Sequence, residues 1–135
     1  NIQEQILRIY YKKLGGLKDI EFIFDCSDSY PFKYPKIVYK INEGVSKNIL
    51  ELIRIKTRGG REELSEISEY KCLCCMTIIC EANWAPSYNI DHIMDELECF
   101  VGLRVRIRNR LCLKLLLQKY KEMPEDVYGY IKAYL

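Results

Sequence analysis

Two prolines within six residues are the strongest constraint on how this chain can fold. Residues 30–35 read Tyr-Pro-Phe-Lys-Tyr-Pro. Proline lacks a backbone N–H and has a fixed φ, so this stretch can continue neither a regular strand nor a helix. Apolar residues alternate with polar ones on either side of it, over residues 17–26 and 36–41, which predicts a strand in each segment. We therefore expect two strands that are joined by an irregular turn.

Helical spacing of apolar residues dominates the rest of the N-terminal half. Residues 1–14 place apolar side chains at steps of three and four, which is typical of an amphipathic helix. Gly15 and Gly16 are expected to end this helix. Residues 45–56 show the same spacing more weakly and predict a second helix, which ends before an expected flexible turn at residues 57–61.

The C-terminal half is predicted to be mainly helical. An N-cap asparagine opens a helix over residues 89–100, and Gly102 is expected to close it. Residues 103–110 alternate apolar side chains with arginine, which favours a short strand or the lead-in to the next helix. Residues 111–121 look helical, and Pro124 followed by two acidic residues is a typical start for the last helix.

The order of these elements predicts the fold class. A nearly continuous apolar run at residues 72–80 indicates a buried strand or an extended segment. Strands followed by helices are typical of an α+β fold, with an antiparallel sheet flanked by helices. With 135 residues, the chain fits one domain over residues 1–135. The composition, 49% apolar and 30% charged, is globular and argues against disorder.

The cysteines and the apolar runs indicate a compartment. The chain has seven cysteines, an odd number without the regular spacing of a disulfide framework, which indicates a reducing environment. No stretch reaches the roughly 18 apolar residues that a membrane span needs. The start also lacks a basic and then apolar signal segment. We therefore expect a cytoplasmic or nuclear protein that has no membrane partner.

Two motifs resemble segments of ubiquitin-conjugating (E2) enzymes. Residues 30–37, Tyr-Pro-Phe-Lys-Tyr-Pro-Lys-Ile, resemble the YPFxxPxI/V turn that follows a strand in this family. Residues 75–79, Cys-Met-Thr-Ile-Ile, resemble the family's active-site segment, and the Trp-Ala-Pro of residues 84–86 with the helix start at residues 88–90 follows as in the family. The order and separation of the motifs also match. The resemblance implies a UBC-like fold.

The resemblance also implies an activity. Members of this family accept ubiquitin or a ubiquitin-like modifier from an activating enzyme (E1) as a cysteine thioester and pass it to a lysine with a ligase (E3), without a cofactor. The covalent step needs an accessible thiolate. Cys75 stands nine positions before Trp84 and is the expected nucleophile, with Cys74 and Cys72 as alternatives. The remaining cysteines are interpreted as small apolar side chains of the interior: Cys26, Cys80, Cys99 and Cys112.

Four further residues match the two loops that this family presents to ligases. Phe32 and Lys33 match the first loop, and Pro86 and Ser87 match the second. Packing or turn geometry would explain these residues equally well, because isolated exposed aromatic side chains are common. Trp84 is expected to be a structural anchor under the active-site loop.

Departures from the family's pattern favour a second hypothesis, a catalytically inactive E2-like protein that acts as a binding or scaffold subunit. The His-Pro-Asn motif that precedes the family's cysteine is absent, since no asparagine lies between Asn48 and Asn83. Thr77 stands where many members carry an acid. The glycine pair after the predicted first helix also implies that the family's first hairpin is missing or shortened. The enzyme is the first of the two hypotheses, and membership of a larger complex is left open.

Two other kinds of site compete with these hypotheses at the cysteines. Cys72, Cys74, Cys75 and Cys80 are close in sequence, but a tetrahedral zinc site usually draws on two separate pairs, so no metal is expected. A hydrolase pair of Cys75 and His92 lacks a third residue that would orient the histidine.

A run of four arginines is the last candidate: Arg104, Arg106, Arg108 and Arg110. On one face of a strand these guanidinium groups would bind phosphates. The net charge is only +2, and one-sided charge is more often the solvated side of an element. Nucleic acid is therefore not the expected partner, and an acidic surface of a modifier or ligase fits the arginines equally well.

Overall fold

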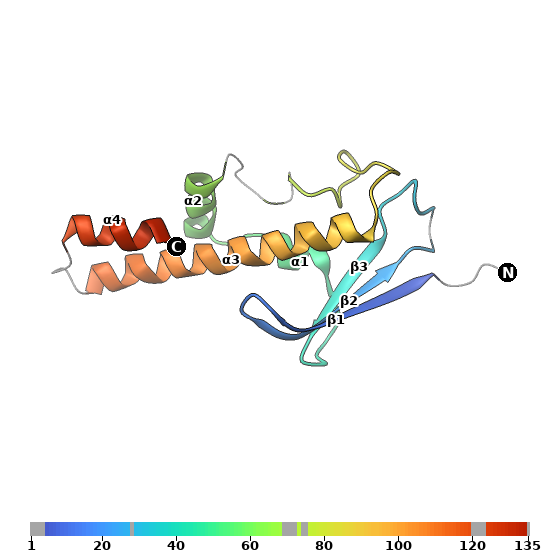
Figure 1. Ribbon diagram of the computed structural model, residues 1–135, viewed down its shortest axis with the longest axis horizontal. Coiled ribbons are helices and arrows are strands. Elements are labelled where there is room, and N and C mark those ends of the chain that lie inside the picture. Colours follow the sequence, from blue (N-terminus) through green and yellow to red (C-terminus); the bar gives the residue numbers. More distant parts are fainter. Residues whose placement is uncertain (1–4, 28, 69–72, 74–75, 120–123, 135) are drawn as a thin grey trace.

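The computed structural model describes residues 5–27, 29–68, 73, 76–119 and 124–134. It has a four-stranded antiparallel sheet with helices packed against it, which confirms the α+β class (Figure 1). The strands lie in the sheet in chain order. The elements are β1 Ile6–Leu14, β2 Leu17–Asp25, β3 Lys36–Ile41, β4 Lys47–Asn48, α1 Ile49–Ile53, α2 Arg58–Ile67, α3 Ile90–Lys119 and α4 Glu125–Tyr134.

The first two strands form a hairpin, so the predicted helix at the start of the chain is wrong over the described residues. β1 pairs with β2 in a register that places Ile9 opposite Phe22. Gly15 has a φ of +57° in the turn, which glycine adopts without strain. Apolar residues at these positions fit a half-buried strand as well as a helix, and pairing with β2 decides between them. The chain therefore has a hairpin before the proline-rich turn, and its correspondence to the first hairpin of the resembled family stays a prediction.

β2 and β3 confirm the predicted strands, and one face of them forms the core. Ile20, Phe22 and Phe24 alternate along β2 and are fully buried. Ile37 and Tyr39 of β3 lie opposite Phe24 and Phe22 and are also buried. Removing such side chains from water stabilises the fold by about 1.5–3 kcal/mol each. The first half of α3 completes this core with Ile93, Met94, Leu97, Phe100 and Val101.

The chain between the sheet and α3 differs from its prediction. The expected helix over residues 45–56 is reduced to α1, which follows the short strand β4. The expected flexible turn at residues 57–61 belongs to α2, because Thr57 caps this helix and its Oγ1 accepts a hydrogen bond from the Gly60 N–H at 3.0 Å. A Cβ on Gly60 would lie 2.7 Å from Ile55 Cγ2. Glycine is therefore needed for this close approach, although it is a poor helix former.

α3 is one helix of 30 residues, so the predicted end at Gly102 is wrong. Of the two alternatives for residues 103–110, the strand is wrong, and these residues lead without a break into the helix over residues 111–119. The buried face of its second half continues through Ile107, Arg110 and Leu113 at three-residue steps. Because one member of this face is an arginine, the helical period is not visible in the positions of the apolar residues alone. The predicted starts of α3 and α4 are confirmed. Among the described residues, neither α3 nor a shorter helix is apolar enough to cross a membrane.

Ion pairs join α2, α3 and α4 at the end of the molecule away from the first half of α3 (Figure 1). The Arg110 Nε donates to Glu63 Oε2 at 2.6 Å, and its Nη2 bonds to Glu66. Lys114 also pairs with Glu63, and the Lys132 Nζ of α4 lies 2.8 Å from Glu66 Oε2. Burial by itself raises the pKa of Glu63, but hydrogen bonds from Lys114 and Arg110 outweigh it and hold this pKa below its usual range.

Candidate functional site

Trp84 brings the two motifs that carry the family resemblance into contact. Its indole Nε1 donates a hydrogen bond to the carbonyl oxygen of Pro31 at 2.8 Å. The Trp84 ring also packs against Tyr30, with ring centroids 6.3 Å apart, and against Tyr88 at 5.8 Å. A half-buried tryptophan with its N–H bonded to a turn fixes that turn in place. The sequence interpretation of Trp84 as a structural anchor is therefore confirmed.

The row of rings continues from Tyr88 to His92 at the start of α3. These two ring centroids lie 5.7 Å apart. The Asn89 N–H donates to His92 Nδ1 at 3.0 Å, and the His92 N–H donates to Asn89 Oδ1 at 3.1 Å, so the two residues cap the helix reciprocally. His92 is exposed and its Nδ1 accepts this cap. His92 therefore has a structural role at the start of α3. This role explains the histidine without a catalytic pair of His92 and Cys75.

Glu96 organises the segment that follows the predicted nucleophile. Its carboxylate accepts a hydrogen bond from the Thr77 hydroxyl, and the Ile78 N–H donates to its two oxygens at 3.0 and 3.1 Å. The Asn83 side-chain amide donates to the Thr77 carbonyl at 3.0 Å. Burial raises the pKa of Glu96, and its hydrogen bonds offset only part of this. Thr77 was singled out because it replaces an acid, and the structure supplies a carboxylate beside it from α3.

Sequence reasoning did not identify Glu96, although a signal for it exists. Position 96 is three residues after Ile93 and four before Phe100, and both of these side chains are buried. A helix places such positions on one face. The signal is therefore a glutamate within the apolar face of a predicted helix. Such a carboxylate is removed from water and needs hydrogen-bond donors from elsewhere in the protein.

The expected ligase-binding residues lie on and beside an open hollow. A hollow of about 280 Å³ is lined by the Pro-rich turn and by Trp84, and it includes Phe32 and Lys33. The Phe32 side chain is 78% exposed. Pro86 and Ser87 are also exposed, in the turn between Trp84 and Tyr88, but they do not line this hollow. Trp84 thus holds both expected loops at the same end of α3.

The three candidate nucleophiles, Cys75, Cys74 and Cys72, lie outside the described residues. Of the apolar run at residues 72–80, Leu73 and residues 76–80 are described. They form turns and bends, so the strand, the first of the two predicted alternatives, is wrong for these residues. The Ile78 N–H donates to Glu96, and the Asn83 side-chain amide donates to the Thr77 carbonyl, so these side chains satisfy the backbone in place of a neighbouring strand. Leu73 and Thr77 are buried on either side of the three-residue stretch that includes Cys75.

The four described cysteines do not all fit the interpretation as interior apolar residues. Cys26 and Cys80 are half-buried, whereas Cys99 and Cys112 are exposed on α3. Burial raises the pKa of the Cys26 thiol and makes it a poor nucleophile. Within the part of the chain that the structure describes, no group of three or more His, Cys, Asp or Glu side chains could hold a metal ion.

The arginine run does not form one face, because it lies on a helix. Arg110 is buried in the ion pairs with α2. The Arg104 Nη1 donates to the carbonyl oxygens of Leu52 and, at 3.4 Å, Glu51 at the end of α1. Arg106 and Arg108 are exposed. Successive arginines two residues apart point about 200° around the helix axis from one another, which separates the run into two pairs.

Comparison of the chain with protein-family models, with curated protein sequences and with solved structures finds no significant match.

Proposed function

We propose that this protein is an E2-like carrier of ubiquitin or a ubiquitin-like modifier, with Cys75 as the residue that forms the thioester and a UBC-like fold as its framework. The observation that carries the proposal is the hydrogen bond from Trp84 to Pro31. It unites the proline-rich turn with the Trp-Ala-Pro segment, and both resemble segments of the same enzyme family. The resemblance of each motif alone would be weaker, because short motifs recur by chance.

The chemistry requires one thiol on this protein, a modifier that is bound to an activating enzyme as a thioester, and a lysine that accepts the modifier. The Cys75 thiolate attacks the carbonyl carbon of the modifier's thioester on the activating enzyme, a new C–S bond forms, and the enzyme's sulfur leaves and takes up a proton. A lysine amine then attacks the same carbon. The new C–N bond forms, the amine loses a proton, and the Cys75 sulfur leaves as a thiolate.

Glu96 and Asn83 act as positioning residues in this proposal. They fix the backbone at Thr77 and Ile78, which directly follows the segment with the predicted nucleophile. A side chain that must present an atom within a few tenths of an ångström needs such a rigid neighbour. Exposed Phe32 and Pro86 would then offer a ligase two anchors on either side of Trp84.

A non-catalytic E2-like subunit is the second candidate, and one observation favours it. Asn83 is the first asparagine after Asn48, and its side-chain amide is already bonded to the Thr77 carbonyl. Asn83 also follows Cys75 in the chain, whereas the asparagine of the family's His-Pro-Asn motif precedes the cysteine, so it is not the counterpart of that asparagine. Such a subunit would use the surface at Phe32 and Pro86 for binding alone.

A thioester assay distinguishes the two candidates. The protein is incubated with an activating enzyme, ATP and a panel of modifiers, and the products are compared on reducing and non-reducing gels. We expect an adduct that a reducing agent removes and that is absent in Cys75→Ala, while Cys72→Ala and Cys74→Ala retain it. If the adduct is lost in Cys72→Ala or in Cys74→Ala instead, that cysteine is the residue that forms the thioester. Absence of an adduct with every modifier would favour the non-catalytic subunit.

A further inference from the structure

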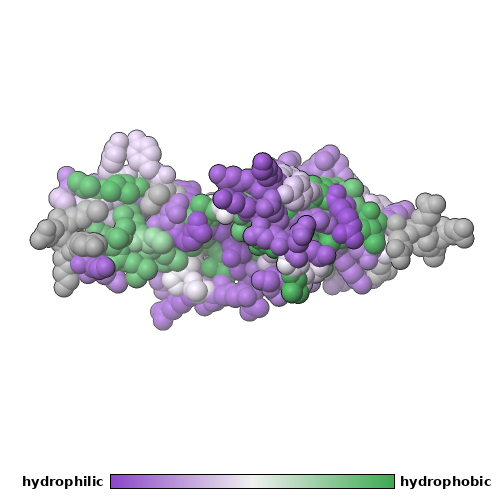
Figure 2. Space-filling model, turned by 90° about the horizontal axis from the view of Figure 1, so that it is seen from below, coloured by the Kyte–Doolittle hydropathy of each residue, from purple (hydrophilic) through white to green (hydrophobic). Residues whose placement is uncertain are grey.

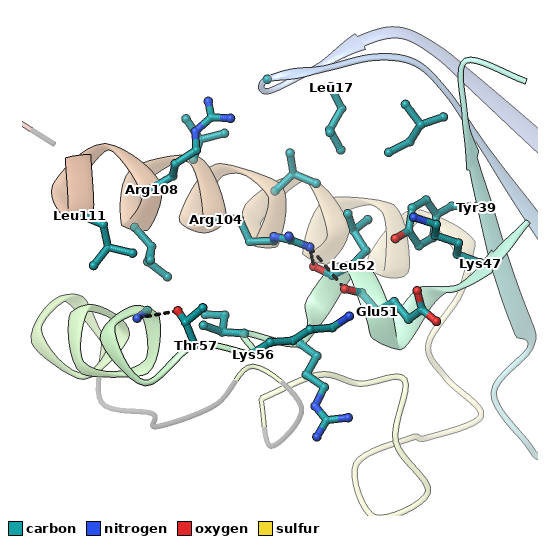
Figure 3. A pocket seen from close by; sticks show the side chains of 18 residues that line it. Leu17, Tyr39, Lys47, Glu51, Leu52, Lys56, Thr57, Arg104, Arg108 and Leu111 are labelled. Atoms are coloured by element: carbon teal, nitrogen blue, oxygen red, sulfur yellow. Dashed lines mark hydrogen bonds between the residues drawn. The ribbon is translucent and has the colours of Figure 1, made fainter. Parts of the chain in front are cut away.

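A cavity of about 540 Å³ lies between the β1–β2 turn, α3 and the chain from β4 to the start of α2 (Figure 3). It shares no lining residue with the hollow beside Trp84. Its volume is within the range of protein pockets that bind ligands, roughly 300 to 1,000 Å³. The cavity is therefore a second candidate site, separate from the one that the proposed carrier function uses.

Apolar side chains that the fold does not cover line this cavity. Five of its lining residues are aliphatic and only half-buried: Leu17, Ile41, Ile55, Val105 and Leu111. They come from the sheet, from the segment before α2 and from α3. An apolar group that entered the cavity would contact all three elements and be removed from water.

Basic side chains surround the same cavity. Five of them and one acid line it, all exposed: Lys47, Arg54, Lys56, Arg104, Arg108 and Glu51. Among the described residues none of the five forms an ion pair, in contrast to the arginine and lysines of the α2–α3–α4 network. Figure 3 shows Arg108 extending from α3 and Lys56 from the segment between α1 and α2. The positive charge therefore comes from separate elements around one opening.

Arg104 is a preorganised part of this rim. Its Nη1 donates to the carbonyl oxygens of Leu52 and Glu51, which holds the guanidinium at the wall of the cavity (Figure 3). Its Nε and Nη2 make no hydrogen bond to another described residue. A guanidinium offers five N–H donors in a fixed plane, so the unused ones can bind a carboxylate without further ordering of the side chain.

We propose that this cavity binds an acidic peptide segment of a partner protein, which inserts one aliphatic or aromatic side chain between α3 and the sheet. The basic rim is complementary to carboxylates, and the uncovered aliphatic walls are complementary to the inserted side chain. The phosphates of nucleic acid would pair with the basic side chains of the rim, but they would leave the aliphatic side chains of the walls exposed to water. Only Arg104 and Arg108 of the arginine run line the cavity. The proposal does not depend on thioester formation at Cys75.

A selection with random peptides tests this chemistry without assuming a partner. The full chain is immobilised, and a phage library of random peptides about 12 residues long is selected against it. We expect the enriched peptides to combine several Asp or Glu residues with one Leu, Ile, Phe or Trp. The most enriched peptide is then synthesised with a fluorophore, and its dissociation constant is measured by anisotropy at two salt concentrations. Binding should weaken with salt, because exposed charges are screened.

Charge reversal on the rim locates the binding site. Lys56→Glu with Arg108→Glu should weaken the peptide by about tenfold or more. The matched control is Arg61→Glu with Arg106→Glu, because these residues are equally exposed and do not line the cavity. It should weaken the peptide by less than about threefold. Replacing the peptide's apolar residue by alanine should cost about tenfold as well. Hydrogen exchange of the unmodified protein, with and without peptide, should show new protection at residues 52–57 and 101–111.

Several outcomes would overturn the proposal. The selection could yield no peptide, or peptides without acidic residues. The two double variants could weaken the peptide equally, which would indicate non-specific attraction to positive charge. A short single-stranded DNA could displace the peptide and lose its own binding in Lys56→Glu with Arg108→Glu, which would identify a nucleic-acid site. Peptide-induced protection that is absent from residues 52–57 and 101–111 would place the site elsewhere, even if a variant failed to fold.

Discussion

Trp84 is the residue whose replacement tests the link between the two motifs. Trp84→Phe keeps an aromatic ring but removes the indole N–H that donates to the Pro31 carbonyl. We expect the free energy of unfolding to fall by about 1–3 kcal/mol, because the half-buried Pro31 carbonyl loses this donor and retains its desolvation cost. Urea unfolding followed by circular dichroism measures this. Tyr134→Phe, at an exposed aromatic residue of α4, is the control and should change stability by less than about 0.5 kcal/mol.

Glu96 should give the protein a distinct pH dependence. Its pKa is raised by burial in the folded state, so the folded protein binds this proton more tightly than the unfolded chain does. The resulting stabilisation is complete below the unfolded pKa of about 4.3 and is lost as pH rises through the folded pKa. Glu96→Gln removes this titration and keeps an oxygen that can accept from the Ile78 N–H. The free energy of unfolding of Glu96→Gln, relative to that of the unchanged protein, should therefore increase as pH rises.

The same experiment has a clear negative outcome. If the difference between the two proteins is constant from about pH 4 to pH 8, the pKa of Glu96 is not raised by folding. Glu98→Gln serves as the control, since Glu98 is a glutamate on the same helix but is exposed. Its replacement should leave the pH dependence of stability unchanged.

The site residues show what single positions reveal from sequence alone. Trp84 was identifiable because a large aromatic residue between two proline-containing turns has few roles other than an anchor. Glu96 was not identified, because its role depends on two donors that are distant in sequence, the Thr77 hydroxyl and the Ile78 N–H. The roles of Phe32 and Pro86 stay predictions, since exposure of a side chain is necessary for binding a ligase but does not demonstrate it.

At the scale of elements, Arg110 is the residue that joins α2 to α3. It is 7% exposed and donates to the fully buried Glu63. Arg110→Ala should lower the free energy of unfolding by about 3–5 kcal/mol, because it removes one member of a buried ion pair and leaves Glu63 with Lys114 alone. Arg106→Ala, one turn away and exposed, should cost less than about 0.5 kcal/mol. Equal stability of the two variants in urea would contradict this role of the network.

Gly102 tests whether α3 is one helix. It is exposed, and nothing lies within 4 Å of the position that a Cβ would occupy. Gly102→Ala should raise the free energy of unfolding by about 0.5–1 kcal/mol, because alanine is the better helix former. Gly15→Ala should do the opposite, since φ is +57° there and the new Cβ would lie 2.7 Å from Val101 Cγ1. A destabilised Gly102→Ala would indicate a helix end at this position.

The elements that were wrongly predicted share one physical cause. Residues 6–14 carry apolar side chains that fit both periods, and only their pairing with β2 makes them a strand. Residues 103–110 alternate like a strand, but Arg104 bonds to α1 and Arg110 to α2, so both arginines belong to the packed faces of a helix. The pattern of apolar and polar residues within one segment does not show which distant segments that segment will contact. β2 and β3 were predictable because their alternation is strict and their core face is fully buried.

At the scale of the whole molecule, stability should decrease from the sheet toward α4. Figure 2 shows apolar side chains gathered at the end of the molecule where α3 ends, and Leu115 and Leu116 there are exposed. α4 has no buried residue in its described part, and Lys132 ties it to Glu66 by an ion pair that is partly exposed. Such a helix can separate from the rest of the fold without uncovering the core.

Hydrogen exchange at neutral pH measures this difference directly. Amides of α4 should exchange at least about a hundred times faster than those of β2, whose Ile20, Phe22 and Phe24 are fully buried. Low concentrations of guanidinium should accelerate exchange in β2, which opens only by global unfolding, and leave α4 nearly unchanged because its local opening exposes little surface. Equal protection of α4 and β2, with the same dependence on guanidinium, would mean that α4 unfolds together with the core. The ion pair of Lys132 with Glu66 would then have to stabilise α4 far more than a partly exposed pair usually does.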